Sequence, residues 1–307
     1  MPDSHIDDDI VQPFQIDPFR LRGRLVRLGP ALDRILTRHD YPVPVATLLG
    51  EAIVLVITLS GALKYKGVFT LQTKGDGPIR LLVADVTTAG AVRGYAQFDA
   101  TKLAQLGPDA GSSVPRLLGA GYLALTVDQG EHTERYQGIV ALEGATLAEC
   151  VHHYFRQSEQ VEAGIKVAVG QRRDSDGQLR WRGGTLMIER LPKDGGADAA
   201  REAEDEGWRR AMVLMATGTS EELLDSNLTP EALLFRLFHE DGVRAYRPHV
   251  LTAQCRCSRE RVERMLTALP PRDLIDLAVD GKLVVTCEFC NATYSFDEET
   301  VAAMAPP

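Results

Sequence analysis

The stretch CRCSRERVERML (residues 255–266) places two cysteines one residue apart, directly before a predicted helix. A second pair follows in VTCEFCNATYSF (residues 285–296), and 29 residues separate the two pairs. In an extended segment the side chains at i and i+2 point the same way, so Cys255 and Cys257 can face one ion. Two short-spaced pairs around a small insert are typical of a tetrahedral four-cysteine zinc site, with one zinc per chain. The predicted ligands are Cys255, Cys257, Cys287 and Cys290.

The residues around these cysteines predict a small module with little core of its own. Four apolar residues repeat at helical spacing after Ser258 and predict an amphipathic helix. They are Val262, Met265, Leu266 and Leu269. A second helix is predicted over residues 272–281, and a hairpin over residues 283–296 carries the second cysteine pair at its turn. Because a module of about 50 residues buries little apolar surface, zinc is expected to supply much of its stability, about 10–16 kcal/mol.

Composition limits the class of protein. The 307 residues are 44% hydrophobic and 25% charged, which is typical of a soluble globular protein. The formal charge of −9 gives no attraction for nucleic acid or anionic membranes, so neither is expected as a partner. The first 17 residues hold five aspartates and no lysine or arginine, unlike a targeting peptide, and the apolar stretch 52–63 is shorter than a membrane span. These observations predict a cytoplasmic protein, in which paired cysteines more often bind metals or sense oxidants than form permanent disulfides.

The same four cysteines fit two other kinds of zinc site. A nucleic-acid-binding zinc ribbon is disfavoured because residues 255–300 carry six basic and nine acidic side chains. An inert structural zinc site remains open on the residues alone.

The chain upstream of the cysteines predicts an α+β core over residues 1–192. A long buried helix is expected after Pro44. Hairpins are expected over residues 67–86, with the turn at Gly75–Gly77, and over residues 121–142. Further segments are a helix over residues 146–160 and strands over residues 165–173 and 183–192. The fold class is therefore a hairpin-rich sheet core with helices, a helical linker and a small C-terminal four-cysteine module.

Between the core and the cysteines the composition changes. Residues 193–207 are small, polar and acidic and predict an exposed linker, and two or three amphipathic helices are expected after it. Thr229 is a plausible N-cap with Pro230 at the first helical position. On these residues alone, the helices could equally form a small domain permanently docked on the core.

No set of residues predicts an enzyme. Cys150 and His153 lie one helical turn apart, but a buried thiol beside a surface histidine is the simpler interpretation of that spacing. The Gly75–Gly77 turn fits a hairpin better than a phosphate-binding loop.

The cysteine pattern, with CSRER directly after the second thiol, resembles the 33-kilodalton heat-shock protein family of bacterial redox-regulated holdase chaperones. Other similar stretches are LLGEA, LQTKGDGPIRLLVAD, YFRQSEQ, GGTLMIERLP, and EELL followed by LLFRLFHED. The resemblance covers nearly the whole chain after about residue 20, and the cysteine pattern is its most specific part.

The resemblance implies that the four cysteines hold zinc in a reduced, inactive monomer. It also implies that oxidation joins Cys255 to Cys257 and Cys287 to Cys290, releases the metal and unfolds a metastable linker over residues 193–250. The active form would be a homodimer that holds unfolded client proteins without ATP. The domains are then 1–192, 193–250 and 251–307. The linker's candidate client-binding residues are Trp208, Met212, Met215, Leu233, Leu234, Leu237 and Phe238.

One alternative function differs in class. A zinc-binding regulatory or scaffold protein with one defined partner would carry the same cysteines. A holdase would instead suppress aggregation of several unrelated proteins.

Overall fold

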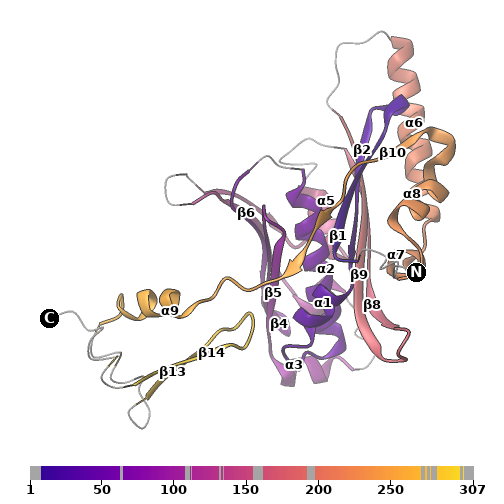
Figure 1. Cartoon of the computed structure of the whole chain (residues 1–307). Helices are drawn as coiled ribbons and strands as arrows, with labels where there is room; N and C mark the ends of the chain where they lie inside the picture. The colour runs from indigo at the N-terminus through magenta and orange to yellow at the C-terminus, as the bar shows by residue number, and fades with distance from the viewer. Residues whose placement is uncertain are drawn as a thin grey trace, which may run out of the picture. The chain divides into compact units, whose positions relative to one another are not determined.

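The computed structural model describes residues 8–62, 65–107, 111, 113–130, 133, 135–154, 162–191, 198–270, 274, 277, 282–297 and 300. Internal contacts divide the chain into two compact units, Met1–Ala253 and Gln254–Pro307. The first unit contains two six-stranded sheets and most of the helices, and the second contains a helix and a two-stranded sheet (Figure 1). The predicted α+β fold class, with the cysteines in a small C-terminal module, is confirmed.

Helix α2 (Val43–Ser60) is the centre of the first unit. Thirteen of its 18 residues are buried, and it contacts strands of both sheets, so it lies between them (Figure 1). Helices α1 (Pro30–Leu36) and α5 (Leu147–Tyr154) contact it. The sequence analysis limited the apolar stretch to residues 52–63, shorter than a membrane span, and this was wrong. By length and composition alone, helix α2 is long and apolar enough to cross a membrane. Within the protein, however, 72% of it is buried, as in the core helix of a folded domain.

One sheet covers one side of this central layer in the strand order β12-β5-β4-β3-β6-β7. Its strands are β3 (Val68–Gly75), β4 (Ile79–Thr87), β5 (Ala91–Phe98), β6 (Gly121–Asp128), β7 (Tyr136–Ala141) and β12 (Thr252–Ala253). Both predicted hairpins are confirmed, since β3 pairs with β4 and β6 with β7 in antiparallel register. Strand β5 was not predicted. Two short helices, α3 (Ala100–Gln105) and α4 (Val114–Leu117), follow it.

The other sheet has the order β10-β1-β2-β9-β8, with β11 also paired to β1. Its strands are β1 (Ile10–Ile16), β2 (Leu21–Leu28), β8 (Ala163–Arg173), β9 (Leu179–Arg190), β10 (Val243–Ala245) and β11 (His249–Val250). A short 3-10 turn, η1 (Asp17–Phe19), joins β1 to β2. Strands β8 and β9 were predicted and pair as a hairpin. Strands β1 and β2 were missed. Nearly every residue of β2 and β9 is buried because helices cover both faces of this sheet.

Three helices pack on the outer face of this second sheet: α6 (Asp198–Thr217), α7 (Ser220–Leu224) and α8 (Pro230–Phe238) (Figure 1). The prediction of an exposed linker up to residue 207 was wrong, because α6 already begins at Asp198. Alanine, glutamate and arginine are strong helix formers, so a polar composition did not exclude a helix here. The predicted N-cap is confirmed: Thr229 accepts a hydrogen bond from the Ala232 amide, and Pro230 follows it.

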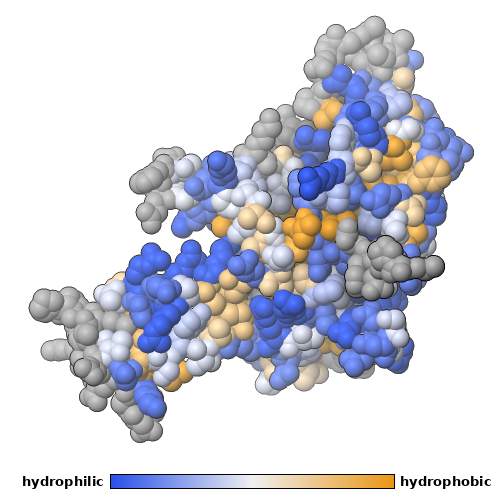
Figure 2. Space-filling model, in the orientation of Figure 1, coloured by the Kyte–Doolittle hydropathy of each residue, from blue (hydrophilic) through white to orange (hydrophobic). Residues whose placement is uncertain are grey.

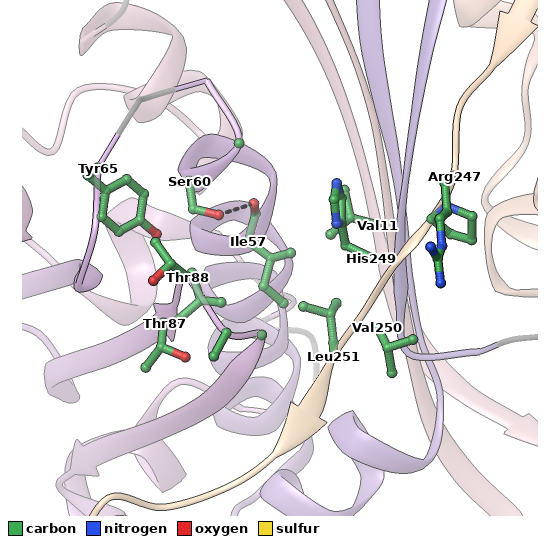
Figure 3. A pocket seen from close by; sticks show the side chains of 15 residues that line it. Val11, Ile57, Ser60, Tyr65, Thr87, Thr88, Arg247, His249, Val250 and Leu251 are labelled. Atoms are coloured by element: carbon green, nitrogen blue, oxygen red, sulfur yellow. Dashed lines mark hydrogen bonds between the residues drawn. The ribbon is translucent and has the colours of Figure 1, made fainter.

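The segment after α8 passes from one sheet to the other. After the 3-10 turn η4 (His239–Asp241), β10 and β11 pair with β1, and β12 then pairs in parallel with β5. A cavity of about 620 Å³ lies beside this crossing, between Leu251 and the end of α2 (Figure 3). The hydrophilic face seen in Figure 2 is interrupted by apolar patches near this crossing and over α8, where Val250 and Phe235 are exposed. Three very short strands therefore lead directly to the first cysteine.

Candidate metal centre

The second cysteine pair lies at the turn of a hairpin formed by β13 (Lys282–Thr286) and β14 (Thr293–Asp297). The Cys287 amide donates to the Ala292 carbonyl at 2.9 Å, and the Asn291 amide donates to the Cys287 carbonyl at 2.8 Å. Asn291 has a φ of 58°, a left-handed conformation that asparagine adopts more readily than most residues. The turn predicted from the sequence thus fixes both thiols close together.

The first pair lies in an extended segment that ends at helix α9 (Arg259–Leu266). Ser258 caps this helix by accepting a hydrogen bond from the Arg261 amide at 3.3 Å, and the Arg261 guanidinium donates to the Arg256 carbonyl at 2.8 Å. The predicted helix start after Ser258 is confirmed. Capping orients the residues just before the helix, which include Cys255 and Cys257.

The four sulfurs converge on one point. Cys255 Sγ lies 3.7 Å from Cys287 Sγ, and Cys257 Sγ lies 3.3 Å from Cys290 Sγ. All four sulfurs lie within 4.8 Å of one another. Tetrahedral Zn–S bonds of about 2.3 Å would place sulfurs about 3.8 Å apart, so this cluster has the size of a four-thiolate metal site. The four cysteines, brought together from two segments, could hold one metal ion.

The electrostatics of the cluster favour a cation at its centre. Burial raises the pKa of the Cys290 thiol to about 12, and its hydrogen bonds with neighbouring thiols act in the same direction. Burial also raises the pKa of Cys287, although the Phe289 and Cys290 amides donate to its sulfur and oppose this effect. Four thiolates at this spacing therefore need a compensating positive charge at neutral pH. The Tyr294 hydroxyl adds a hydrogen bond to the Cys257 sulfur.

The module around the sulfurs has a very small core. Its described buried apolar residues are Val262, Leu266, Leu274, Leu283 and Phe296. Arg259 lies over the Phe296 ring at 4.4 Å from its centroid and ion-pairs with Glu263 at 3.0 Å. Met265, predicted on the apolar face of α9, is 51% exposed, so that assignment was wrong. The predicted helix over residues 272–281 lies outside the described residues apart from positions 274 and 277.

The candidate client-binding residues lie elsewhere, in the helices on the outer face of the second sheet. Five of the seven are buried in this structure, and the other two, Trp208 and Met212, pack partly exposed against the same apolar cluster. The buried five are Met215, Leu233, Leu234, Leu237 and Phe238. They contact strand residues such as Phe14, whose ring stacks on Phe238 with centroids 5.9 Å apart. In this arrangement the helices hide their apolar face.

Cys150 belongs to the main core. It is fully buried on α5, and burial raises the pKa of its thiol to about 11, far from the range of a reactive thiolate. His153, on the same helix, is partly exposed. The geometry thus favours a packing role for Cys150 over nucleophilic chemistry.

We expect Cys150→Ser to lower the free energy of unfolding by no more than about 1.5 kcal/mol. The new hydroxyl can bond the carbonyl of Thr146, which already accepts from the residue 150 amide. Denaturant unfolding measures the cost, and metal content of the purified variant should equal that of the parent chain. A variant that lost metal would place Cys150 in the metal centre.

Two buried arginines that sequence analysis did not identify join the helices to the sheet. Arg27, on β2, donates to the carbonyls of Asp225 and Leu228 with one nitrogen and to the Glu222 carbonyl at 2.7 Å with another. Arg182, on β9, donates to the Leu224 carbonyl at 2.9 Å. The sequence carried one signal that could have identified them, an arginine within an otherwise apolar strand. A charge buried in this way needs fixed partners. We call residues 222–228 the docking turn.

The family model described as Hsp33 protein matches residues 9–297. The 33 kDa chaperonin of Caulobacter vibrioides is 41% identical over 298 residues, covering 96% of this chain and 97% of that protein. The 33 kDa chaperonin of Pseudomonas fluorescens is 38% identical over 300 residues, covering 97% and 94%. The crystal structure of the 33 kDa chaperonin (Hsp33 homologue) of Thermotoga maritima superimposes with a TM-score of 0.78 at 25% identity, covering 97% of this chain and 98% of that chain.

Fold and site together define a chaperone with an α+β domain and a four-cysteine C-terminal module, not an enzyme. The chain belongs to the Hsp33 family. The family resemblance stated from the sequence is therefore confirmed.

Proposed function

We propose that this chaperone is an ATP-independent holdase of the cytoplasm, switched on by oxidation of its four clustered cysteines. The observation that carries the proposal is the convergence of four thiols within 4.8 Å in a module with a very small core. A module of this kind depends on its metal for stability, and its ligands are the side chains that oxidants attack. The scaffold alternative is set aside because the relatives are named as chaperonins.

In the reduced state, Cys255, Cys257, Cys287 and Cys290 would hold one zinc ion. All-sulfur tetrahedral donor sets are typical of structural zinc, which supplies a cross-link between the two segments and keeps all four sulfurs as thiolates. Amide donors at the hairpin turn and the Tyr294 hydroxyl hold the sulfurs in place.

Oxidation would remove the ligands in pairs. Two thiolates give up two electrons to a peroxide or a similar oxidant and form one disulfide, whose sulfurs no longer bind the metal. The proposed pairs are Cys255–Cys257 and Cys287–Cys290. In a tetrahedral cluster every sulfur is close to the other three, so the pairing rests on the family resemblance and not on the distances.

Loss of the module would then release the linker, residues 193–250. Continuity of the chain supports this step, because only the 3-10 turn η4 and strands of three, two and two residues lie between α8 and the first cysteine. Once β10–β12 separate from β1 and β5, fewer contacts hold the helices on the sheet. The apolar side chains now packed on that sheet would become the surface that binds unfolded clients. The active protein would be a homodimer. The charge of −9 supports neither nucleic acid nor anionic membranes as partners.

A light-scattering assay tests the proposed function. The oxidised protein should suppress aggregation of several unrelated unfolding proteins without ATP, whereas the reduced, metal-loaded protein should not. Equal activity of both forms would contradict redox control, and protection of a single client would contradict a general holdase.

The purified reduced protein should contain one zinc per chain with four sulfur ligands. Zinc quantification and X-ray absorption measure these two numbers independently. Nitrogen or oxygen in the coordination shell would overturn the four-cysteine assignment, and His239 or His249 would then become a candidate ligand.

A further inference from the structure

A cavity of about 600 Å³ separates helix α5 from helix α6, over strand β8, and two methionines of α6 line it. Met212 is partly exposed there, and Met215 is buried beside it. Both pack on the backbone of β8 at Gly164: a Cβ atom on that glycine would lie 2.5 Å from the Met212 sulfur and 2.8 Å from the Met215 methyl carbon. The Met212 side chain therefore borders an accessible cavity and also forms part of the contact between α6 and the sheet.

The described methionines differ in how oxidation would affect them. Met265 is 51% exposed on α9, so its oxidation changes little packing. Met187 is fully buried in β9, so oxidants do not reach it in the folded protein. Met212 combines partial exposure with a packing role, because it contacts the apolar cluster that joins the helices to the sheet.

We propose that Met212 is an oxidation site whose conversion to the sulfoxide loosens α6 from strand β8. The oxidant is a peroxide or hypochlorous acid. With a peroxide, the thioether sulfur takes one oxygen atom as the O–O bond breaks, and the second oxygen leaves as water after a proton shift. Sulfur loses two electrons and the peroxide gains them. With hypochlorous acid, the sulfur first takes the chlorine as the O–Cl bond breaks and hydroxide leaves. Water then displaces chloride and loses two protons, so the same sulfoxide forms and the chlorine gains the two electrons.

The sulfoxide at Met212 should weaken the packing of α6 because it is much more polar than the thioether. A sulfoxide places a strong dipole where a thioether packs against Gly164 and the apolar cluster. Polar contacts also hold α6. Asp205 pairs with Arg190 at 2.6 Å, and the Ala216 carbonyl accepts from Lys166 at 3.2 Å. Arg210 pairs with Asp241 at 2.7 Å, so the sulfoxide is expected to loosen the helix and not to detach it. The inference rests on the proposed function in one respect, because it adds a second route to release of the same helices, independent of the cysteines.

The experiment separates the two kinds of oxidation chemically. The full-length protein is treated with hypochlorous acid, then reduced with dithiothreitol and reloaded with zinc, which restores the cysteines but leaves sulfoxides in place. Peptide mass spectrometry should find one added oxygen on Met212 and on Met265 but not on Met187. Amide hydrogen exchange in α6 should rise by about tenfold or more, the factor expected for burying one unsatisfied dipole. Methionine sulfoxide reductase should reverse this rise.

Three variants test whether oxidation of Met212 itself loosens α6. Met212→Leu should abolish the residual rise in exchange after rezincation, whereas Met265→Leu should leave it unchanged. Met212→Gln, a polar substitute for the sulfoxide, should raise exchange in α6 without oxidant. Unchanged exchange in Met212→Gln, or a sulfoxide at residue 212 without faster exchange, would overturn the inference. Faster exchange without any suppression of aggregation would support the oxidation site and contradict the proposed holdase function instead.

Discussion

Arg27→Met should release helices α7 and α8 from the sheet while the metal centre remains intact. Arg27 is 1% exposed, and its guanidinium supplies the donors for three carbonyls of the docking turn, at residues 222, 225 and 228. Methionine fills similar space but donates nothing, so three carbonyls lose their donor inside an apolar interface. Removing one partner from a buried charged network costs about 3–5 kcal/mol. A docked state destabilised by that amount opens more often by a factor of about 10² to several times 10³.

Two measurements follow for this variant. Hydrogen exchange should increase across residues 220–238 in the reduced, zinc-loaded protein, and light scattering should show suppression of client aggregation without oxidant. Zinc content should stay at one per chain. Full protection of residues 220–238 in the variant would contradict the role of Arg27 in holding the docking turn.

Arg236→Met is the matched control. Arg236 also bonds residue 222, through an ion pair with the Glu222 carboxylate at 2.6 Å, but its side chain is 41% exposed. Exposed pairs contribute about 0–1 kcal/mol, so this variant should behave like the parent chain. Similar loosening in both variants would mean that any lost charge at this turn is sufficient.

The parts of the fold that the sequence predicts are those with local patterns. The hairpin over residues 67–86 has alternating apolar residues around a glycine-rich turn, and α8 has an N-cap, a proline and an apolar face. Strand β2 lacks such a pattern, because both of its faces are buried while arginines occupy three of its positions. A buried strand can contain those arginines because the docking turn and β9 supply their partners. Such partners are close in space and distant in sequence.

The cysteine cluster was predictable because cysteine is a rare residue type and the four have a specific spacing. The sequence indicated which side chains converge, and the hairpin turn and the Ser258 cap explain how they do so. The docking surface was harder to predict, since Leu233 and Phe238 have the same pattern in a permanent helical domain and in a releasable one. The difference is the free energy of docking, which depends on contacts such as that of Arg27.

Removing the proposed zinc ion, by a chelator or by oxidation, should unfold the cysteine module before any other part of the chain. Structural zinc contributes about 10–16 kcal/mol of binding free energy, comparable to or larger than the net stability of whole domains, about 5–15 kcal/mol. The five buried apolar residues described in the module cannot replace that contribution. Hydrogen exchange should therefore rise first in residues 255–270 and 282–297.

Exchange should then spread to residues 198–250, whose short strands β10 and β11 and docked helices precede the module in the chain. The two sheets should stay protected around α2, because their core is independent of the cysteines. Mild heat should accelerate the second step more than the first, since unfolding rates rise about 3–6-fold per 10 °C whereas chelation or oxidation of the partly buried cysteines does not require unfolding of the helices. Aggregation suppression should follow the second step in time. A metal-free protein that held clients while residues 198–250 remained protected would contradict this coupling, and the client surface would then have to lie on the sheets.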